Sequence, residues 1–457
     1  AIIHLLNYAA GNVGRTVRFG PDSAFGSASP YALMLGLTQA MARGEVEVLL
    51  LIHGNPLFTL PPKAGFAEAL KKVPLVVSFS NQPDETTQQA HLILPDLHPL
   101  ESWGDFSPRA GVIGLLQPTM SPVFDGKAVG DVLLSVGRQA LGSPEGKGPL
   151  RWQSFAEYLK ERWRGIVREF SPATPFDQFW EDALRRGGVW KDAGTVSVQA
   201  RPAAVKGKVP AVEGDAQGLT LLTYPSHRFY DGRGANKPWL QEVPDTMTQV
   251  TWDSWVEVPP GTAGKLGVKN GDIVKVTSPH GAIELPAYIS ESIHPGAVAI
   301  PIGQGHTAYG RYAKDRGANP ITLLPGQATP GGLPFLSVKV TLTRTGARRP
   351  LAIAQATHDQ DEREIAQHVG LGAARELELR GAVPEKASHP SMYPEVKYPE
   401  YRWGMAVDVD ACIGCQACVI ACKAENNVPV VGKEQVAYGR DMHWLRLERW
   451  QEGKPEH

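Results

Sequence analysis

The sequence has 457 residues and a formal net charge of -1, from 46 Lys and Arg against 47 Asp and Glu. This balance excludes a protein whose main function is to bind nucleic acid through a basic surface. Hydrophobic residues make up 42% of the chain and charged residues 20%, which excludes a largely disordered protein. With only 4 cysteines the chain is not a disulfide scaffold, and its length suggests about three domains.

Residues 1–202 alternate short apolar runs with helical segments, which is the pattern of an α/β domain. Val46–Ile52 and Val73–Ser78 have the length and apolar content of buried parallel strands. Leu33–Arg43 and Phe66–Lys72 have helical spacing. We therefore predict a doubly wound α/β domain over this region.

The polar segment His53-Gly54-Asn55-Pro56 follows the first of these strands. The carboxyl ends of parallel strands are where ligands bind in open α/β sheets, so a cofactor contact is one interpretation. An ordinary tight turn is the other, and the residue types favour it.

Several carboxylates come after the second strand, and two of them flank His98. They are Asp84, Glu85, Asp96 and Glu101. Paired carboxylates can act as acid and base in catalysis, but such residues more often cap helices and complete turns. We favour the structural role here.

Residues 203–217 are small and polar and are predicted to be a linker, and residues 218–343 then change to strands and tight turns. The candidate strands are Trp255–Val258, Ile273–Thr277, Ala282–Ile289 and Ala297–Ile302. A closed barrel or compact β domain is expected. His306 lies in a Gly-rich loop, where a hydrogen-bonded loop histidine is a simpler explanation than a ligand contact.

Residues 344–400 are predicted to be a connector, with one helix near 361–369. Its later part contains Pro384, Pro390, Pro394 and Pro399, which favour an extended strap. No apolar run has the roughly 18 to 20 residues that a membrane span needs. Neither end of the sequence resembles a domain boundary, so we expect it to be part of a longer chain.

All four cysteines lie in residues 401–457, in a C-x2-C-x2-C-x3-C run made of Cys412, Cys415, Cys418 and Cys422. This spacing is typical of [4Fe–4S] ligation, in which three cysteines serve one cluster and the fourth serves a second. Gly414 permits the tight turn that the motif requires. Lys423 stands where small bacterial ferredoxins have proline. A zinc site is the alternative, but zinc ribbons use two separated cysteine pairs.

Three segments resemble known proteins. HGNPLFTLPP and VPLVVSFSNQPDETTQQAHLILPDLHPLESWGD (residues 73–105) resemble the third domain of molybdopterin oxidoreductases. Residues 255–313, with GDIVKVTSPHGAIELPAYIS and PIGQGHTAYGRYA, resemble their C-terminal dinucleotide-binding domain, a double-psi β-barrel. The tail RWGMAVDVDACIGCQACVIACKAENNVPVVGKEQV resembles the start of a multi-cluster ferredoxin subunit. Fused in one chain, they resemble the large iron–sulfur subunit of bacterial alternative complex III.

The resemblance implies three domains and a connector: an α/β domain over 1–202, a double-psi β-barrel over 218–343, the connector 344–400 and an incomplete ferredoxin-like domain over 401–457. It implies three [4Fe–4S] clusters and one [3Fe–4S] cluster in the full-length protein, with the molybdopterin cofactor absent. The implied partners are an integral-membrane quinol-binding subunit and multihaem and monohaem cytochrome c subunits, in a hetero-oligomeric complex on the periplasmic face of the cytoplasmic membrane.

Our main hypothesis is an electron-transfer subunit that relays electrons from quinol through iron–sulfur clusters to haem subunits. The alternative is a catalytic molybdopterin-dependent reductase of a sulfur compound or oxyanion, fused to its own iron–sulfur module. In that alternative Gly54, Asn55, Asp84 and the loop around His306 line the pterin-dinucleotide site. A third possibility makes the α/β and barrel regions a docking scaffold only.

Overall fold

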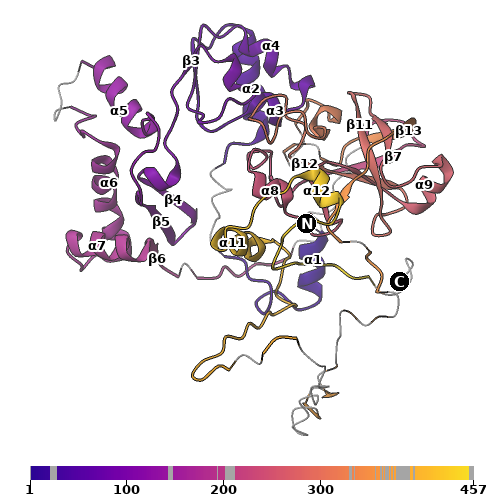
Figure 1. The fold of residues 1–457 in the computed structure, drawn as a ribbon. Coiled ribbons are helices and arrows are strands. Elements are labelled where there is room, and N and C mark those ends of the chain that lie inside the picture. Colours follow the sequence, from indigo (N-terminus) through magenta and orange to yellow (C-terminus); the bar gives the residue numbers. More distant parts are fainter. Residues whose placement is uncertain are drawn as a thin grey trace.

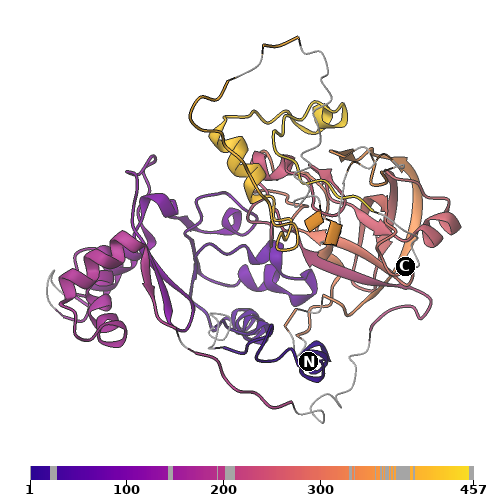
Figure 2. The same ribbon diagram turned by 90° about the horizontal axis from the view of Figure 1, so that it is seen from below.

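The structure is a computed structural model that describes residues 2–20, 28–142, 148–192, 194–200, 212–328, 332–333, 335–355, 357–360, 363, 365, 370, 372–373, 375–376, 392–394 and 397–451. Figure 1 shows a helical lobe at one end of the molecule and a β-barrel at the other, with the first α/β unit between them. The cysteine-bearing segment lies against the barrel side (Figure 2).

The first unit contains a three-stranded parallel sheet in the order β1-β2-β3. Its elements are α1 (Ile2–Ala9), α2 (Tyr31–Ala42), β1 (Val48–Leu51), α3 (Pro56–Thr59), η2 (Pro62–Ala64), α4 (Phe66–Leu70), β2 (Leu75–Ser78), η3 (Thr87–Gln89) and β3 (Leu92–Ile93). The predicted strands and helices are confirmed at these positions, with shorter strands. Within the described residues the strands of this sheet follow one another in one direction, so the reversal of a doubly wound sheet is not seen in it.

Residues 104–190 form a separate antiparallel lobe, which the predicted α/β pattern did not anticipate. It contains η4 (Pro99–Glu101) at its entry, then β4 (Gly104–Arg109), β5 (Val112–Leu116), α5 (Val129–Ala140), α6 (Phe155–Phe170), α7 (Phe176–Arg186) and β6 (Gly188–Trp190). Trp163, Phe179 and Trp180 fill its core against Leu115. The Ser154 hydroxyl caps α6 by accepting from the Glu157 backbone N–H, at 3.2 Å.

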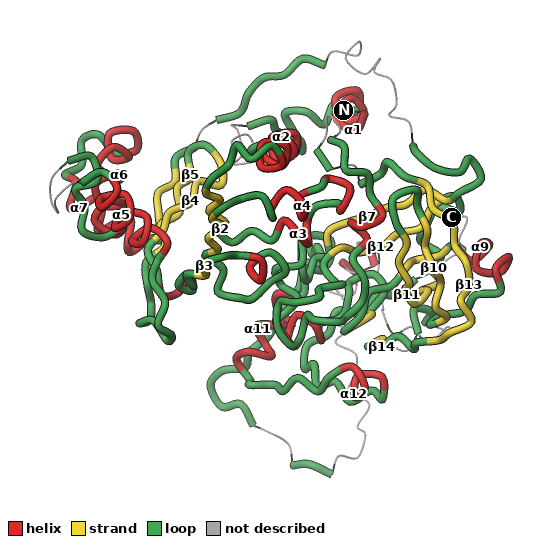
Figure 3. Tube along the Cα trace, turned by 90° about the horizontal axis from the view of Figure 1, so that it is seen from above, coloured by secondary structure: helices red, strands yellow, loops and turns green. Residues whose placement is uncertain are grey.

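A closed six-stranded barrel follows, in the order β10-β11-β9-β12-β7-β13. Its strands are β7 (Leu219–Pro225), β9 (Val256–Val258), β10 (Asp272–Thr277), β11 (Ala282–Ile289), β12 (Ala297–Ile302) and β13 (Lys339–Arg348). The predicted closed barrel is confirmed, with a mixture of parallel and antiparallel pairs. Figure 3 shows its strands gathered around one core, which is lined by buried aliphatic side chains such as Leu221, Val274 and Ile300.

The remaining elements lie around the barrel. They are α8 (Pro238–Glu242), β8 (Val250–Thr251), α9 (Pro260–Leu266), η6 (Pro320–Leu323), β14 (Ala352–Ile353), α11 (Ala417–Glu425) and α12 (Lys433–Ala437). The start of the predicted connector is therefore ordered: β13 continues to Arg348, and β14 pairs with β8. Pairing between β10 and β13 fixes residues 344–348, the first part of the predicted connector. The predicted helix near 361–369, most of the linker 203–217, Pro384 and Pro390 lie outside the described residues.

Candidate cofactor site and cysteine segment

The candidate site lies where the parallel sheet meets the Gly-rich loop of the barrel. The loops that follow β1 and β2 contact residues 303–312, which follow β12. The Tyr309 backbone N–H donates to the Pro83 carbonyl at 3.1 Å, and Asn236 Nδ2 donates to Gln82 Oε1 at 3.0 Å. Polar loops from two separate folding units therefore share one surface.

Glu85 is at the centre of this surface. Its Oε1 accepts from the backbone N–H groups of Thr307, at 2.7 Å, and Ala308, at 3.0 Å. Asn55 Nδ2 donates to its Oε2 at 2.7 Å, and His306 Nδ1 lies 3.2 Å from both carboxylate oxygens. The structure therefore brings together Asn55 and the His306 loop, as the hypothesis of a pterin-dinucleotide site predicted.

These contacts determine the protonation of Glu85. Burial raises the pKa of its carboxyl group, but the hydrogen bonds from His306 and Asn55, the nearby His306 charge and the Ala308 N–H lower it by more. The net effect is a pKa of about 2, against an ordinary value of 4.5. Glu85 is therefore ionised at neutral pH and places a negative charge against the barrel loop.

His306 is a fully hydrogen-bonded residue, as we favoured. Its side chain is 2% exposed, and its Nε2 lies 3.2 Å from the Gly232 carbonyl oxygen. Its ring stacks on Phe58 with 3.7 Å between centroids and 6° between planes, and Tyr309 lies on it at 5.0 Å. These contacts fix the ring between the two units.

Glycines let the backbone approach closely at this surface. Gly305 has φ +97°, and a Cβ there would lie 2.2 Å from the Asn319 backbone nitrogen. Gly232 has φ +110°, and a Cβ there would lie 2.4 Å from Phe58. The loop conformation therefore requires glycine at both positions.

A buried polar group lies behind the loop that follows β7. Arg228 is 5% exposed and donates through Nη1 to the Val243 carbonyl at 2.9 Å. Within the described residues its Nε has no hydrogen-bond partner. Burial lowers the pKa of Arg228 to about 10. Burial has the opposite effect on Glu257 and raises the pKa of its carboxyl group, whose Oε1 accepts from the Tyr224 hydroxyl at 2.8 Å.

The carboxylates that we assigned to caps and turns do take structural roles. Asp84 Oδ1 accepts from the Thr87 N–H at 2.7 Å. Asp96 Oδ1 accepts from the Val129 N–H at 2.9 Å, at the first residue of α5, and Glu101 accepts from two backbone N–H groups. The segment after β1 bends at residues 52–53 and leads directly into α3, where Asn55 is the N-cap residue and also joins the candidate site.

The cysteine segment lies on the barrel unit at the start of α11. Cys412, Cys415 and Cys418 are exposed free thiols and Cys422 is half-buried. Gly414 has φ +67°, and its carbonyl accepts from Thr246 Oγ1 at 2.6 Å. The backbone at Gly414 is left-handed, as glycine permits, the turn residues before it are 409–411, and α11 carries Cys418 and Cys422.

The chemistry of this donor set fits an iron–sulfur group, because four free thiols lie within eleven residues of sequence. The geometry is open: among the residues that the structure describes, no three His, Cys, Asp or Glu side chains are gathered to hold a metal ion. Ligation by Cys412, Cys415, Cys418 and Cys422 therefore stays a prediction.

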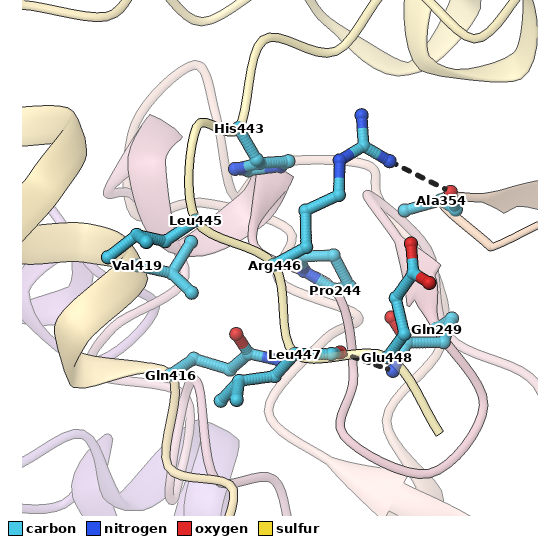
Figure 4. A pocket seen from close by; sticks show the side chains of 10 residues that line it. All are labelled: Pro244, Gln249, Ala354, Gln416, Val419, His443, Leu445, Arg446, Leu447 and Glu448. Carbon is cyan, nitrogen blue, oxygen red and sulfur yellow. Dashed lines mark hydrogen bonds between the residues drawn. The ribbon is translucent and has the colours of Figure 1, made fainter. Parts of the chain in front are cut away.

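A small cavity lies behind the cysteine helix, between α11 and residues 443–448 (Figure 4). Its volume is about 10 Å³, the space of roughly one water molecule. Figure 4 shows Val419 beside Leu445, with Arg446 reaching toward the Ala354 carbonyl. The helix packs here too closely to leave room for a cofactor.

None of the helices in the described parts of the chain is long and apolar enough to span a lipid bilayer.

Comparisons with known proteins bear on the barrel and on the chain as a whole. Residues 219–336 match the family model of the molydopterin dinucleotide binding domain. The "Menaquinone reductase, molybdopterin-binding-like subunit" of Nitratidesulfovibrio vulgaris is 29% identical over 305 residues, which are 64% of this chain and 41% of that protein. The "Arsenate respiratory reductase molybdopterin-containing subunit ArrA" of Chrysiogenes arsenatis is 28% identical over 365 residues, 62% of this chain and 43% of that protein.

One further relative and one solved structure complete these comparisons. The periplasmic nitrate reductase of Desulfovibrio desulfuricans is 25% identical over 308 residues, 58% of this chain and 38% of that protein. Among solved structures, acetylene hydratase from Pelobacter acetylenicus superposes with a TM-score of 0.49 at 17% identity, over 67% of this chain and 46% of that one. The chain has molybdopterin oxidoreductase homologues and spans less than half the length of each of these proteins.

The expectation that molybdopterin is absent is wrong. The family model that matches residues 219–336 is that of a domain that binds this cofactor, and the arsenate reductase relative is named as a molybdopterin-containing subunit. The matched residues include barrel strands β7, β9, β10, β11 and β12. The expectation came from the alternative complex III resemblance, and no residue of this chain indicated an empty pocket.

The meeting surface holds the donors that an anionic dinucleotide would need, but each is already paired in this structure. The N–H groups of Thr307 and Ala308 donate to Glu85, and the exposed guanidinium of Arg233 donates to Asp231 at 2.7 and 2.8 Å. The close backbone approaches at Gly305 and Gly232 are to Asn319 and Phe58, so a dinucleotide would have to displace these contacts.

Four residues of these surfaces were missed from sequence: Arg228, Arg233, Asn236 and Glu242, the last of which is buried against Lys423 of α11. Each is a polar residue in a segment of mixed composition, where no spacing rule marks it. The only available signal was the pair of charged residues Arg228 and Glu242 on either side of the glycine-rich segment 232–234.

Proposed function

We propose that this chain is part of a molybdopterin-dependent oxidoreductase that acts on an oxyanion or a sulfur compound, fused to its iron–sulfur module. The observation that carries the proposal is the dinucleotide-binding match over residues 219–336, which falls on the closed barrel. Relatives named for arsenate and nitrate reduction support an oxyanion as substrate.

In this proposal the meeting surface holds the dinucleotide. The N–H groups of Thr307 and Ala308 and the guanidinium of Arg233 would bind its phosphates, and Asn236 would orient a polar group of the nucleotide. The molybdopterin group, when bound, supplies the redox chemistry. Glu85, which is ionised, would have to give up its bonds to the loop N–H groups if phosphate oxygens take them.

The cysteine segment would carry electrons to or from this site. Thiolate ligation by Cys412, Cys415, Cys418 and Cys422 provides one-electron iron–sulfur chemistry. The segment contacts the barrel unit directly through Thr246 and Gly414. A module docked on the cofactor-binding unit suits electron transfer between the two.

Metal and pterin analysis of the purified full-length protein tests the proposal. We expect molybdenum and a pterin dinucleotide in stoichiometric amounts in the wild type. Arg233→Met should weaken dinucleotide binding by about tenfold or more, because it removes a charge-assisted contact worth roughly 1.5–3 kcal/mol. Arg151→Met, an exposed arginine of the helical lobe, is the matched control. Wild-type protein without pterin would refute the proposal.

A second candidate is a quinol-linked electron-transfer subunit of the alternative complex III type. The observation that favours it is the 29% identity to a menaquinone reductase subunit. Its partners would be an integral-membrane quinol-binding subunit and cytochrome c subunits, and it would lie on the periplasmic face of the cytoplasmic membrane.

Two activity assays separate the candidates. Reduction of nitrate, arsenate or a sulfur compound by the purified protein with a dye electron donor supports the reductase. Quinol-dependent cytochrome c reduction by the isolated membrane complex, without oxyanion or sulfur-compound reduction, supports the electron-transfer subunit.

A further inference from the structure

Lys423, the residue after the last cysteine, is buried in an ion pair with Glu242. The Lys423 side chain is 1% exposed and that of Glu242 is 0% exposed, and Lys423 Nζ lies 3.1 Å from Glu242 Oε1. Lys423 belongs to α11 and Glu242 is the last residue of α8 on the barrel unit. The pair joins residues 181 positions apart.

Glu242 also binds other parts of the chain. Its Oε2 accepts from the backbone N–H groups of Val431, at 2.9 Å, and Gly432, at 2.8 Å. Trp252 Nε1 donates to the same oxygen at 3.3 Å. The carboxylate thus holds the cysteine helix, the loop before α12 and the barrel unit at one point.

Two neighbouring contacts also join the cysteine segment to the barrel unit. Lys433 Nζ lies 2.6 Å from Asp253 Oδ2, and Gln249 Nε2 donates to the Leu447 carbonyl at 3.1 Å. On the barrel side these partners all lie within residues 242–253. That short stretch is therefore one part of the surface on which the cysteine segment is docked, and residues 354–355 form another.

A fully buried ion pair is not an efficient way to stabilise a fold, because the cost of removing both charges from water offsets most of their attraction. An apolar residue could fill the volume of Lys423, whereas Glu242 must stay polar because three N–H groups donate to it. The charge of Lys423 is therefore the part of the pair that packing does not require, and Lys423 follows the predicted ligand Cys422 directly in sequence.

We propose that Lys423 and Glu242 are positioning residues, which fix the cysteine helix on the barrel unit, and that Lys423 compensates the charge of Glu242, so that this carboxylate holds the helix without lowering the reduction potential of the iron–sulfur group that the cysteines bind. The inference rests on the cysteine assignment under the proposed function. It does not depend on the substrate or on the presence of molybdopterin.

The sign of the effect follows from Coulomb's law. Reduction adds an electron to the iron–sulfur group, so a nearby net negative charge disfavours it and a compensated pair does not. In Lys423→Met, Glu242 keeps three N–H donors but loses its cationic partner, so the potential falls. In Lys423→Met/Glu242→Gln both charges are gone, so the potential returns toward the wild-type value.

The test is a redox titration followed by electron paramagnetic resonance, on full-length protein purified without oxygen. We expect Lys423→Met to have a lower potential than the wild type, and both the double variant and Lys423→Arg to lie close to the wild type. Lys397→Met, at an exposed position, is the matched control for loss of a lysine and should change nothing. Iron content is measured for every protein.

The outcomes separate this inference from the cysteine assignment. Wild-type protein without iron contradicts the assignment, and the inference with it. Normal iron content with equal potentials in wild type and Lys423→Met contradicts the inference alone. If Lys423→Met does not fold, the double variant decides, because it leaves no unpaired charge: a potential far from the wild-type value contradicts the inference, and loss of iron from a folded double variant supports the positioning role.

Discussion

Glu85 joins two parts of the chain that are more than two hundred residues apart. Its contacts with His306 and the two loop N–H groups span a sequence separation of 221 to 223 residues. The residues that meet there come from turns and loops, which the sequence marks only as polar. At this scale the candidate site depends on one carboxylate that connects both folding units.

We predict that Glu85→Gln lowers the free energy of unfolding at neutral pH by about 2 kcal/mol, because a charge-assisted hydrogen-bond network is lost. The loss is not larger because part of the carboxylate is near solvent, which screens its charge. The pKa of Glu85 in the folded protein, about 2, is below its ordinary value of 4.5. The wild type should therefore keep this stabilisation above about pH 4.5 and lose it as the pH falls toward 2.

Urea unfolding across this pH range measures the effect. The difference between wild type and Glu85→Gln should shrink as the pH falls. Glu68→Gln, at an exposed glutamate that pairs with Lys71, is the control and should change stability by less than about 1 kcal/mol. An unchanged difference between pH 5 and pH 3 would show that the charge of Glu85 is not what stabilises the contact.

Cys415→Ser tests the predicted ligand set. A serine hydroxyl is a poor substitute for a thiolate, so we expect loss of one iron–sulfur group, seen as reduced iron and acid-labile sulfide. Ala411→Ser, a neighbouring exposed position, should leave iron content unchanged. Equal iron content in Cys415→Ser and wild type would argue for a different role of the motif.

At the scale of elements, the regular strands were the most predictable part. The bounds of β11 and β12 agree with the predicted ranges, because continuous apolar or alternating runs bounded by turn residues define a strand locally. All six residues of β12 are buried. The helical lobe was not predicted, because β5 pairs with β6 across 74 to 78 residues of sequence.

The loop after β12 is the element most sensitive to substitution. Gly305→Ala should destabilise the protein by roughly 2 kcal/mol or more, since φ is +97° and the new Cβ would meet the Asn319 backbone. Gly261→Ala, in α9 with open space around it, should be neutral or stabilising by up to about 1 kcal/mol. Thermal unfolding of the two variants compares them. Equal melting temperatures would mean that the loop can adopt another conformation.

At the scale of the whole molecule, the hydrophobic interior is divided. The barrel core and the core of the helical lobe are separate clusters of buried residues, and Figure 1 shows the lobe standing apart from the barrel. A molecule built in this way should open locally before it unfolds globally.

Trp163→Ala tests this division. Trp163 is fully buried, and its Nε1 donates to Asp105 at 3.1 Å. We expect a loss of about 3–5 kcal/mol in the helical lobe, seen by hydrogen exchange as faster exchange over residues 104–190 and unchanged exchange over residues 219–348. Faster exchange in the barrel as well would indicate one cooperative unit.

The sequence by itself determined local features: β1, β2, α2 and α4 of the first unit, the barrel strands β9, β10, β11 and β12, and the spacing of four cysteines. Each depends on neighbours within a few residues, through backbone preferences and the periodicity of apolar side chains. Only the tertiary structure decided that Asn55, Glu85 and His306 meet, and that Lys423 is buried against Glu242. These pairings join segments distant in sequence, and their hydrogen bonds form only when the folded cores bring those segments together.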